Sequence, residues 1–168
     1  MEVSSNNGGG YPDIKITVEG CDELAAALKE RGVLVYYEPE GNKEMGKFLR
    51  CVAVSDIVKF SGVRIQDTAF VADYRDKLFI RTMGEEGMEF NLRGGGWKRI
   101  APVPNDHVAD WEGAGDWTTS VILAELCKLD KLDVRRFTEQ EVVGVLEKAA
   151  AIASRSVSYM GSKGMIRE

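Results

Sequence analysis

Residues 33–60 read VLVYYEPEGNKEMGKFLRCVAVSDIVKF, and their pattern decides the class of fold. The opening VLVYY is a continuous apolar, β-branched run, which is typical of a strand covered on both faces. EPEGNKEMGKFLRCV then predicts a loop and a helix, and SDIVKF predicts a second strand. Strands joined by a helix at this spacing form a βαβ unit, so the two strands should be parallel neighbours in one sheet.

The same alternation continues on both sides of this unit. Upstream, IKITVEG from Ile14 predicts a half-buried strand, and DELAAALKERG predicts a helix with Asp22 as its N-cap and Gly32 as its stop. Downstream, a helical stretch around IQDTAFVADYR precedes the short buried strand KLFIRT. We therefore expect an α/β fold, a three-layer sandwich around a mainly parallel sheet.

The pattern changes after residue 88. MEFNL and WKRIAPV predict two strands joined by the turn at residues 93–96, Arg-Gly-Gly-Gly, and hence an antiparallel hairpin at the edge of the sheet. No helix follows this glycine triplet, so it does not resemble a phosphate-binding loop. Two helices close the chain: one over about residues 116–129, and one that opens with the capping-box pair Thr138 and Glu141.

Length and charge restrict the classes of function. A chain of 168 residues fits one domain, for which we expect a flexible leader over residues 1–13 and the folded part over residues 14–168. The net charge of -5 gives no electrostatic footprint for nucleic acid or an anionic membrane, so neither is an expected partner. No apolar run is long enough to span a membrane and no signal peptide is evident, which favours a cytoplasmic location.

The candidate for chemistry is Gly113-Ala114-Gly115-Asp116, placed just before an apolar helical run. Amide groups at a helix start have no partners inside the helix, and small residues let a phosphate or oxyanion approach them. A carboxylate at the same place can accept a proton from an attacking hydroxyl. Taken alone, the four residues fit equally a common tight turn in which Asp116 is the N-cap.

Four ordered segments resemble the ribokinase-like or PfkB carbohydrate kinases, a family that also phosphorylates nucleosides. DWEGAGDWTTSVILAEL looks like the family's signature near the C-terminus, and LFIRTMGEEGMEF resembles the strand and turn on which the nucleotide lies. ALKERGVLVYYEPE and SDIVKFSGVRI are similar to two further family elements. The resemblance runs from about Ile14 to Gly161 and implies the nucleotide-binding C-terminal half of a ribokinase-like fold, truncated at its N-terminus.

The resemblance also implies roles for particular residues. Asp116 would be the catalytic base, with ATP and Mg²⁺ as cofactors. The amides of Gly113, Ala114 and Gly115 would form the anion hole. The nucleotide would lie on Thr82, Gly84 and Gly87. The segment KAAAIASRS would form a wall for the adenine, although close packing of a helix on the sheet explains such an alanine run as well.

Several positions depart from the family pattern. Ser61-Gly62-Val63-Arg64 stands where the family has Asn-x-x-Glu, and Glu38-Pro39-Glu40 replaces its Asp-Pro-Asn type of sequence. The metal ligands are therefore unassigned. Arg64 is either a phosphate contact or an ordinary surface arginine. His107, the single histidine, is expected to lie in a loop or at a strand end without a role.

The family's enzymes are close to twice this length, and their sugar-binding residues lie in an N-terminal half that has no counterpart here. Two hypotheses follow. The first is an ATP-dependent kinase acting on a hydroxyl of a sugar or nucleoside, alone or with the missing half. The second is a non-catalytic relative that binds a nucleotide or a partner. In both cases a cut sheet edge favours a homodimer or a complex with a complementary chain.

Overall fold

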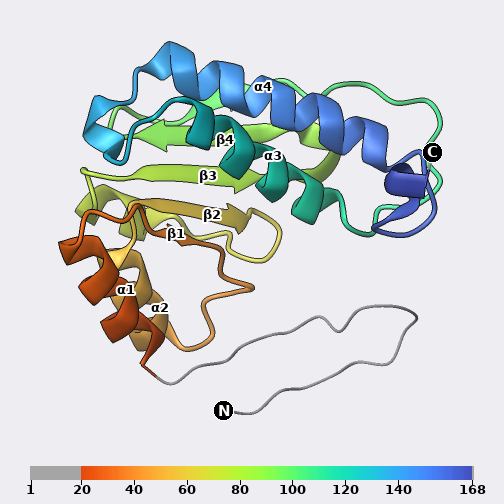
Figure 1. Cartoon of the computed structure of the whole chain (residues 1–168). Helices are drawn as coiled ribbons and strands as arrows, with labels where there is room; N and C mark the ends of the chain where they lie inside the picture. The colour runs from red at the N-terminus through yellow and green to blue at the C-terminus, as the bar shows by residue number, and fades with distance from the viewer. Residues whose placement is uncertain (1–19, 168) are drawn as a thin grey trace.

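Five strands form one open sheet in the computed structural model, which describes residues 20–167 (Figure 1). The strands lie in the order of the chain: β1 (Tyr36–Tyr37), β2 (Ile57–Ser61), β3 (Leu78–Thr82), β4 (Met88–Leu92) and β5 (Lys98–Ile100). The first three are parallel, whereas β4 and β5 are antiparallel to their neighbours. The predicted parallel sheet with an antiparallel edge hairpin is confirmed.

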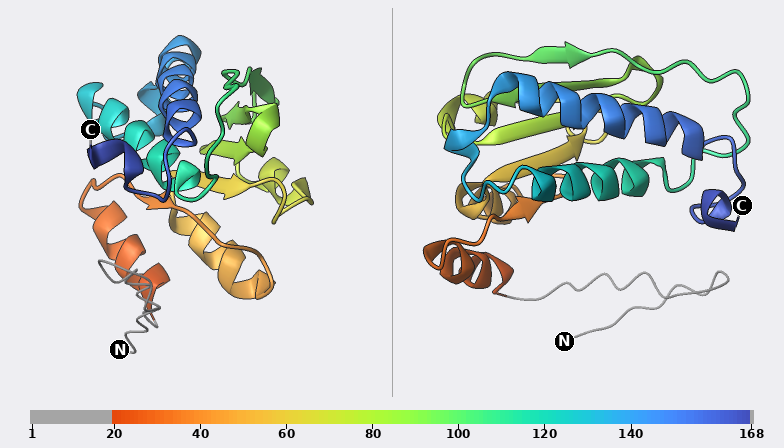
Figure 2. Two further views of the ribbon diagram at one scale, coloured as in Figure 1. Left: turned by 90° about the vertical axis from the view of Figure 1, so that its right-hand side faces the viewer. Right: turned by 45° about the horizontal axis from the view of Figure 1, so that its top comes forward.

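Helices cover both faces of this sheet, so the molecule has three layers (Figure 2). One face carries α3 (Ala114–Lys128) and α4 (Glu139–Ser156), which pack against each other. On the other side lie α1 (Cys21–Glu30), α2 (Met45–Val54) and the 3₁₀ helix η1 (Ala69–Asp73). Short 3₁₀ turns complete the described chain: η2 (Gly84–Glu86), η3 (Val134–Arg136) and η4 (Gly164–Arg167).

Alternate residues of the central strands fill two separate cores. Ile57, Leu78 and Ile80 pack in one cluster with side chains of α3 and α4. Val58 and Phe79 pack in the other with side chains of α2 and η1. Both faces are therefore apolar, which explains why these strands are nearly continuous hydrophobic runs in the sequence.

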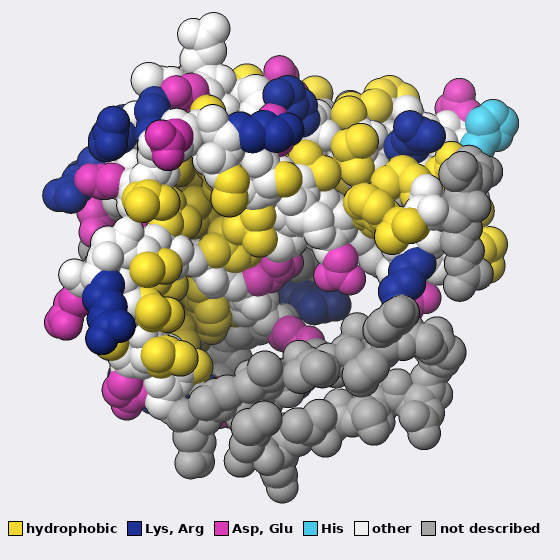
Figure 3. Space-filling view, viewed as in Figure 1, with side chains coloured by type: hydrophobic (Ala, Val, Ile, Leu, Met, Phe, Trp, Pro, Cys, Tyr) yellow, Lys and Arg dark blue, Asp and Glu magenta, His cyan; other side chains and the backbone are white. Residues whose placement is uncertain are grey.

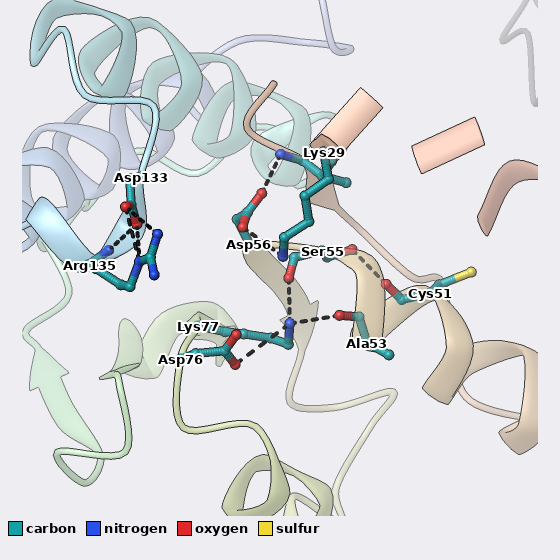
Figure 4. A network of polar contacts seen from close by, with 10 residues as sticks. Lys29, Cys51, Ala53, Ser55, Asp56, Asp76, Lys77, Asp133 and Arg135 are labelled. Carbon is teal, nitrogen blue, oxygen red and sulfur yellow. Dashed lines mark hydrogen bonds and ion pairs between the residues drawn. The ribbon is translucent and has the colours of Figure 1, made fainter. Parts of the chain in front are cut away.

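Polar side chains fix the amino-terminal ends of β2 and β3 (Figure 4). The Asp56 carboxylate accepts a hydrogen bond from the Val35 amide at 2.9 Å and pairs with Lys29, also at 2.9 Å. The buried Lys77 ammonium donates to the main-chain oxygens of Ala53 and Ser55 at 2.9 and 2.7 Å. Burial lowers the pKa of Lys77. Because parallel strands share one direction, this polar cluster lies at the end of the sheet opposite to Ser61 and Thr82.

The helix predictions need two corrections. The N-cap of α1 is Gly20, whereas Asp22 lies in the first turn and accepts a hydrogen bond from Arg50 Nε at 2.9 Å. The stretch predicted as a helix around IQDTAFVADYR forms only the 3₁₀ helix η1. The capping box of Thr138 and Glu141 at the start of α4 is confirmed. The predicted leader and the strand predicted near Ile14 lie outside the described residues.

Candidate functional site

A cavity of about 1160 Å³ opens where the carboxyl ends of β2 and β3 meet the start of α3. The structure brings both predicted groups of site residues to this cavity, although they are about thirty positions apart in the sequence. Its lining includes Thr82, Gly84, Gly87, Gly113, Ala114, Gly115 and Asp116. Ligands of open parallel sheets bind at this end of the strands.

The start of α3 supplies unpaired amide groups to the cavity. Gly113 is the N-cap and has a φ of 80°, a conformation that glycine adopts at little cost. Because glycine has no side chain to cap the helix, the amides of Gly115 and Asp116 find no acceptor within residues 20–167. These N–H groups, together with the positive end of the helix dipole, favour an anion at this point.

Asp116 is the third residue of α3 and is exposed on the cavity wall. The alternative role of Asp116 as N-cap is wrong, because Gly113 occupies that position. The Asp116 carboxylate makes no hydrogen bond and no ion pair with any other residue of the described range. It is therefore available to a substrate hydroxyl that enters the cavity.

The turn after β3 forms a second part of the wall. Thr82 ends β3, Gly84 begins η2, and Gly87 follows it with a φ of 93°. A β-carbon on Gly87 would lie 2.4 Å from the carbonyl oxygen of Ile100, so only glycine fits between this turn and the end of β5. The close packing holds the turn in one position at the cavity edge.

Small residues of α4 line the side of the cavity opposite the strands. Ala150 and Ala153 contribute to the lining, as expected from the alanine run. The facing segment after β5 is tied to α4 by Asn105, whose side-chain amide donates to the Ser154 carbonyl oxygen and, at 2.8 Å, to Ser158 Oγ.

The C-terminal turn, which follows α4 and contains Gly161 and Ser162, is hydrogen-bonded to residues around the start of α3. The Gly161 amide donates to Asp110 Oδ2, and the Trp117 indole N–H donates to the Ser162 carbonyl oxygen, both at 2.9 Å. Hydrogen bonds from the amides of Glu112 and Gly161 lower the pKa of Asp110. Asp110 begins the signature segment, but its role in fixing this turn was not predicted from the sequence.

Comparisons with known proteins give similarity at the level of structure. No protein-family model and no curated protein sequence matches the chain. A fructokinase from Vibrio cholerae, solved with fructose and ADP, superposes with a TM-score of 0.68 at 19% identity, over 83% of this chain and 49% of that one. An aminoimidazole riboside kinase from Salmonella enterica superposes with a TM-score of 0.68 at 20% identity, over 86% and 52%.

An Arabidopsis thaliana ribokinase, solved with ribose and ATP, superposes with a TM-score of 0.62 at 22% identity, over 84% of this chain and 46% of that one. The chain has a ribokinase-like fold. It spans about half the length of these kinases, and the matched part is their C-terminal half.

Charged residues of both signs line the cavity of this ribokinase-like fold. The acidic ones are Glu38, Glu40, Glu85, Glu112 and Asp116, and the basic ones are Lys59 and Arg64. Arg64 is exposed at the turn after β2, so its position is compatible with a phosphate contact. Within residues 20–167, no three His, Cys, Asp or Glu side chains are arranged to hold a metal ion.

Three further residues near the start of α3 differ in whether they line the cavity. His107 is exposed in the segment between β5 and α3 and does not line the cavity. Trp111 lines the cavity, whereas Trp117 donates to the C-terminal turn. In the described part of the chain, no helix has both the length and the apolar character needed to cross a membrane.

Lys59 was not predicted as a site residue. It lies in the middle of β2, and 3% of its side chain is exposed. Its ammonium group is bonded to Glu38, to Thr119 Oγ1 at 2.9 Å and to the Gly115 carbonyl oxygen at 3.3 Å. The available signal was the single charge inside the otherwise apolar run IVKF of residues 57–60, because a buried lysine requires partners.

Proposed function

We propose that this chain is the nucleotide-binding part of an ATP-dependent kinase that phosphorylates a hydroxyl of a sugar or nucleoside. The observation that carries the proposal is that one cavity joins Asp116 and the open amides of α3 to the glycine turn after β3. The neighbouring structures support it, because they were solved with sugar or riboside substrates and with ADP, ATP or an ATP analogue.

In the proposed reaction, Asp116 accepts the proton of the acceptor hydroxyl as its oxygen attacks the γ-phosphorus of ATP. The bond from the γ-phosphorus to the bridging oxygen breaks, and ADP leaves. The amides of Gly113, Ala114 and Gly115 donate to the oxygens of the transferring group. Thr82, Gly84 and Gly87 hold the nucleotide, with Ala150 and Ala153 beside the adenine.

Mg²⁺ would neutralise charge on the phosphates. Such a metal ion is usually held by one or two carboxylates together with the phosphates themselves, so the acidic residues of the cavity fit it without a three-residue cluster. We leave its ligands unassigned. A cytoplasmic location belongs to the same proposal.

The remainder of the substrate site would come from a second polypeptide, either another copy of this chain or a complementary chain. β1 is the end strand of the sheet within the described residues, and no residue of the neighbouring helix α1 is buried. Figure 3 shows hydrophobic side chains gathered on this face, over α1 and beside α3. Leu24 and Leu28 of α1 and Leu123 of α3 are exposed. Light scattering at high concentration tests the association, which a monodisperse monomer would contradict.

The second candidate is a non-catalytic relative that binds a nucleotide or a partner. Arg64 favours this candidate, because it lines the cavity at the position where the ribokinase-like family that the sequence resembles has a carboxylate. Calorimetry and thermal shift with ATP and Mg²⁺ come first, because the absence of both signals would leave only a structural role. A phosphoryl-transfer screen over sugars and nucleosides, with and without the N-terminal half of a ribokinase-like kinase, then separates the candidates. ATP binding without transfer under either condition would favour the non-catalytic one.

A further inference from the structure

An ion pair between a buried lysine and an exposed glutamate contacts the first turn of α3. Lys59 reaches it from β2, and Glu38 reaches it from the segment after β1 with 37% of its side chain exposed. The Lys59 ammonium donates to two groups of α3, the Gly115 carbonyl oxygen at 3.3 Å and Thr119 Oγ1 at 2.9 Å. Thr119 Oγ1 also lies 2.6 Å from Glu38 Oε2, to which it donates. Three separate segments are thus joined at one point.

The positive charge of Lys59 is unusual at the N-terminal end of a helix. A cation near the N-terminus opposes the helix dipole, and a buried ammonium loses its hydration. Glu38 compensates the charge, but with one partner exposed to solvent the pair contributes little to the stability of the fold. What the arrangement does achieve is to fix Gly115 through its carbonyl oxygen and to neutralise the Glu38 carboxylate, which would otherwise place a negative charge near the open amides of the first turn.

We propose that Lys59 is the positioning residue of the anion hole: it holds the first turn of α3 in place and strengthens its binding of a phosphate group. Lys59 acts through Gly115 and Thr119. The part of this inference that concerns the nucleotide rests on the proposed function, whereas the part that concerns the helix turn does not.

The chain contains a matched control for this proposal. Lys77, which directly precedes β3, also has almost no exposed side chain, and its ammonium also donates to main-chain carbonyl oxygens. It lies at the opposite end of the sheet, in the cluster of Figure 4. Lys59→Met and Lys77→Met therefore remove the same charge from equally buried positions, and only the former should affect α3 locally.

Amide hydrogen exchange measured by NMR on the free protein tests the helix turn. The reporters are the amides of the first turn of α3, beginning with the Trp117 N–H that donates to the Gly113 carbonyl oxygen at 2.9 Å. Relative to amides in α4, Lys59→Met should speed their exchange about tenfold, as expected for loss of a hydrogen bond to a charged group. Lys77→Met should leave the ratio unchanged, and Lys59→Arg should restore part of the protection. Equal ratios in the two methionine variants would overturn the proposal.

Thr119→Val provides a second test if Lys59→Met does not fold, since it removes the hydroxyl and leaves the charge pair intact. It should increase exchange in the same turn, and unchanged exchange would again overturn the proposal. Calorimetric titration with ATP tests the phosphate part: Lys59→Met should weaken binding about tenfold or more, and Lys77→Met should not. If the wild-type chain binds no ATP, the proposed function fails while the exchange result still decides the role of Lys59. If wild type and Lys59→Met bind ATP equally, the phosphate part is wrong.

Discussion

Gly113 packs so closely against Ser162 that a β-carbon at residue 113 would lie 2.5 Å from the Ser162 Cβ. The contact joins the entrance of α3 to the C-terminal turn, which Asp110 and Trp117 also hold by hydrogen bonds. The left-handed φ of 80° at Gly113 sets a second restriction on the same residue. Both the backbone angle and the available space therefore demand glycine at the centre of the candidate site.

Gly113→Ala should therefore destabilise the protein and displace the C-terminal turn. Strain at a positive φ costs about 1 kcal/mol, and the overlap with Ser162 raises the total to roughly 2–4 kcal/mol. Urea unfolding measures the loss. Gly144→Ala is the control, because Gly144 lies within α4 and a β-carbon there meets no atom within 4 Å. That variant should gain about 0.5–1 kcal/mol. A Gly113→Ala protein as stable as the wild type would contradict the packing described above.

The strand order and the two layers of helices were predictable because the central strands carry strong local patterns. β2 and β3 are nearly continuous apolar runs, and the glycines of residues 94–96 mark the hairpin turn. The predictions from local sequence failed where contacts between distant residues determine the local structure. Asp22 has the residue type of an N-cap but pairs with Arg50 instead, and the stretch near residue 69 forms only a 3₁₀ helix.

The residues of the candidate site also fall into two groups: those that the local sequence predicts and those that it does not. The helix start at Gly113 and the glycine turn at Gly87 carry local sequence signals, so both could be predicted. Lys59 and Asp110 could not be assigned a role, because their partners lie 56 and 51 positions away in the chain. A sequence shows that such a charge is unusual, but only the fold shows what it contacts.

Glu141 should make the stability of α4 depend on pH. Its carboxylate accepts from the Thr138 amide at 2.8 Å and pairs with Lys131 at 2.5 Å, and these contacts lower its pKa to about 2. A lowered pKa in the folded state means that the contribution is complete above the ordinary glutamate pKa and is lost as the pH falls towards 2. Glu141→Gln should therefore reduce the Tm at pH 7 by about 2–4 °C.

Thermal unfolding of both proteins at several pH values checks this prediction. The difference in Tm between wild type and Glu141→Gln should shrink as the pH falls below about 4.5, the ordinary value for glutamate. Glu147→Gln is the control, because Glu147 is exposed in α4 outside the capping box. A difference that stays constant down to low pH would mean that the charge of Glu141 does not contribute.

Arg64 should contribute to phosphate binding if the exposed guanidinium reaches the nucleotide across the cavity. Arg64→Ala is expected to weaken ATP binding about 5- to 10-fold, since one exposed charge-assisted contact is lost. The loss should shrink at high salt, because screening weakens the attraction in the wild type. Arg136→Ala is the control for net charge, as Arg136 is exposed in η3 beyond the far end of α3. Equal affinity in wild type and Arg64→Ala at low salt would identify Arg64 as an ordinary surface residue.

Asp116→Asn should separate catalysis from binding. The amide keeps the size of the side chain but cannot accept the proton of the attacking hydroxyl, so the rate of phosphoryl transfer should fall at least about 100-fold. The affinity for ATP should change little, since the Asp116 carboxylate makes no hydrogen bond or ion pair in the described part of the chain and its amide remains in the first turn of α3.

The measurement combines turnover under the most active condition of the substrate screen with calorimetric titration of ATP. Asp106→Asn is the matched control, because Asp106 is exposed in the preceding segment and does not line the cavity. Unchanged turnover in Asp116→Asn would remove Asp116 as the base. Loss of ATP binding together with turnover would instead show that the substitution disturbs the anion hole, since a base that acts only on the acceptor hydroxyl is not needed to hold the nucleotide.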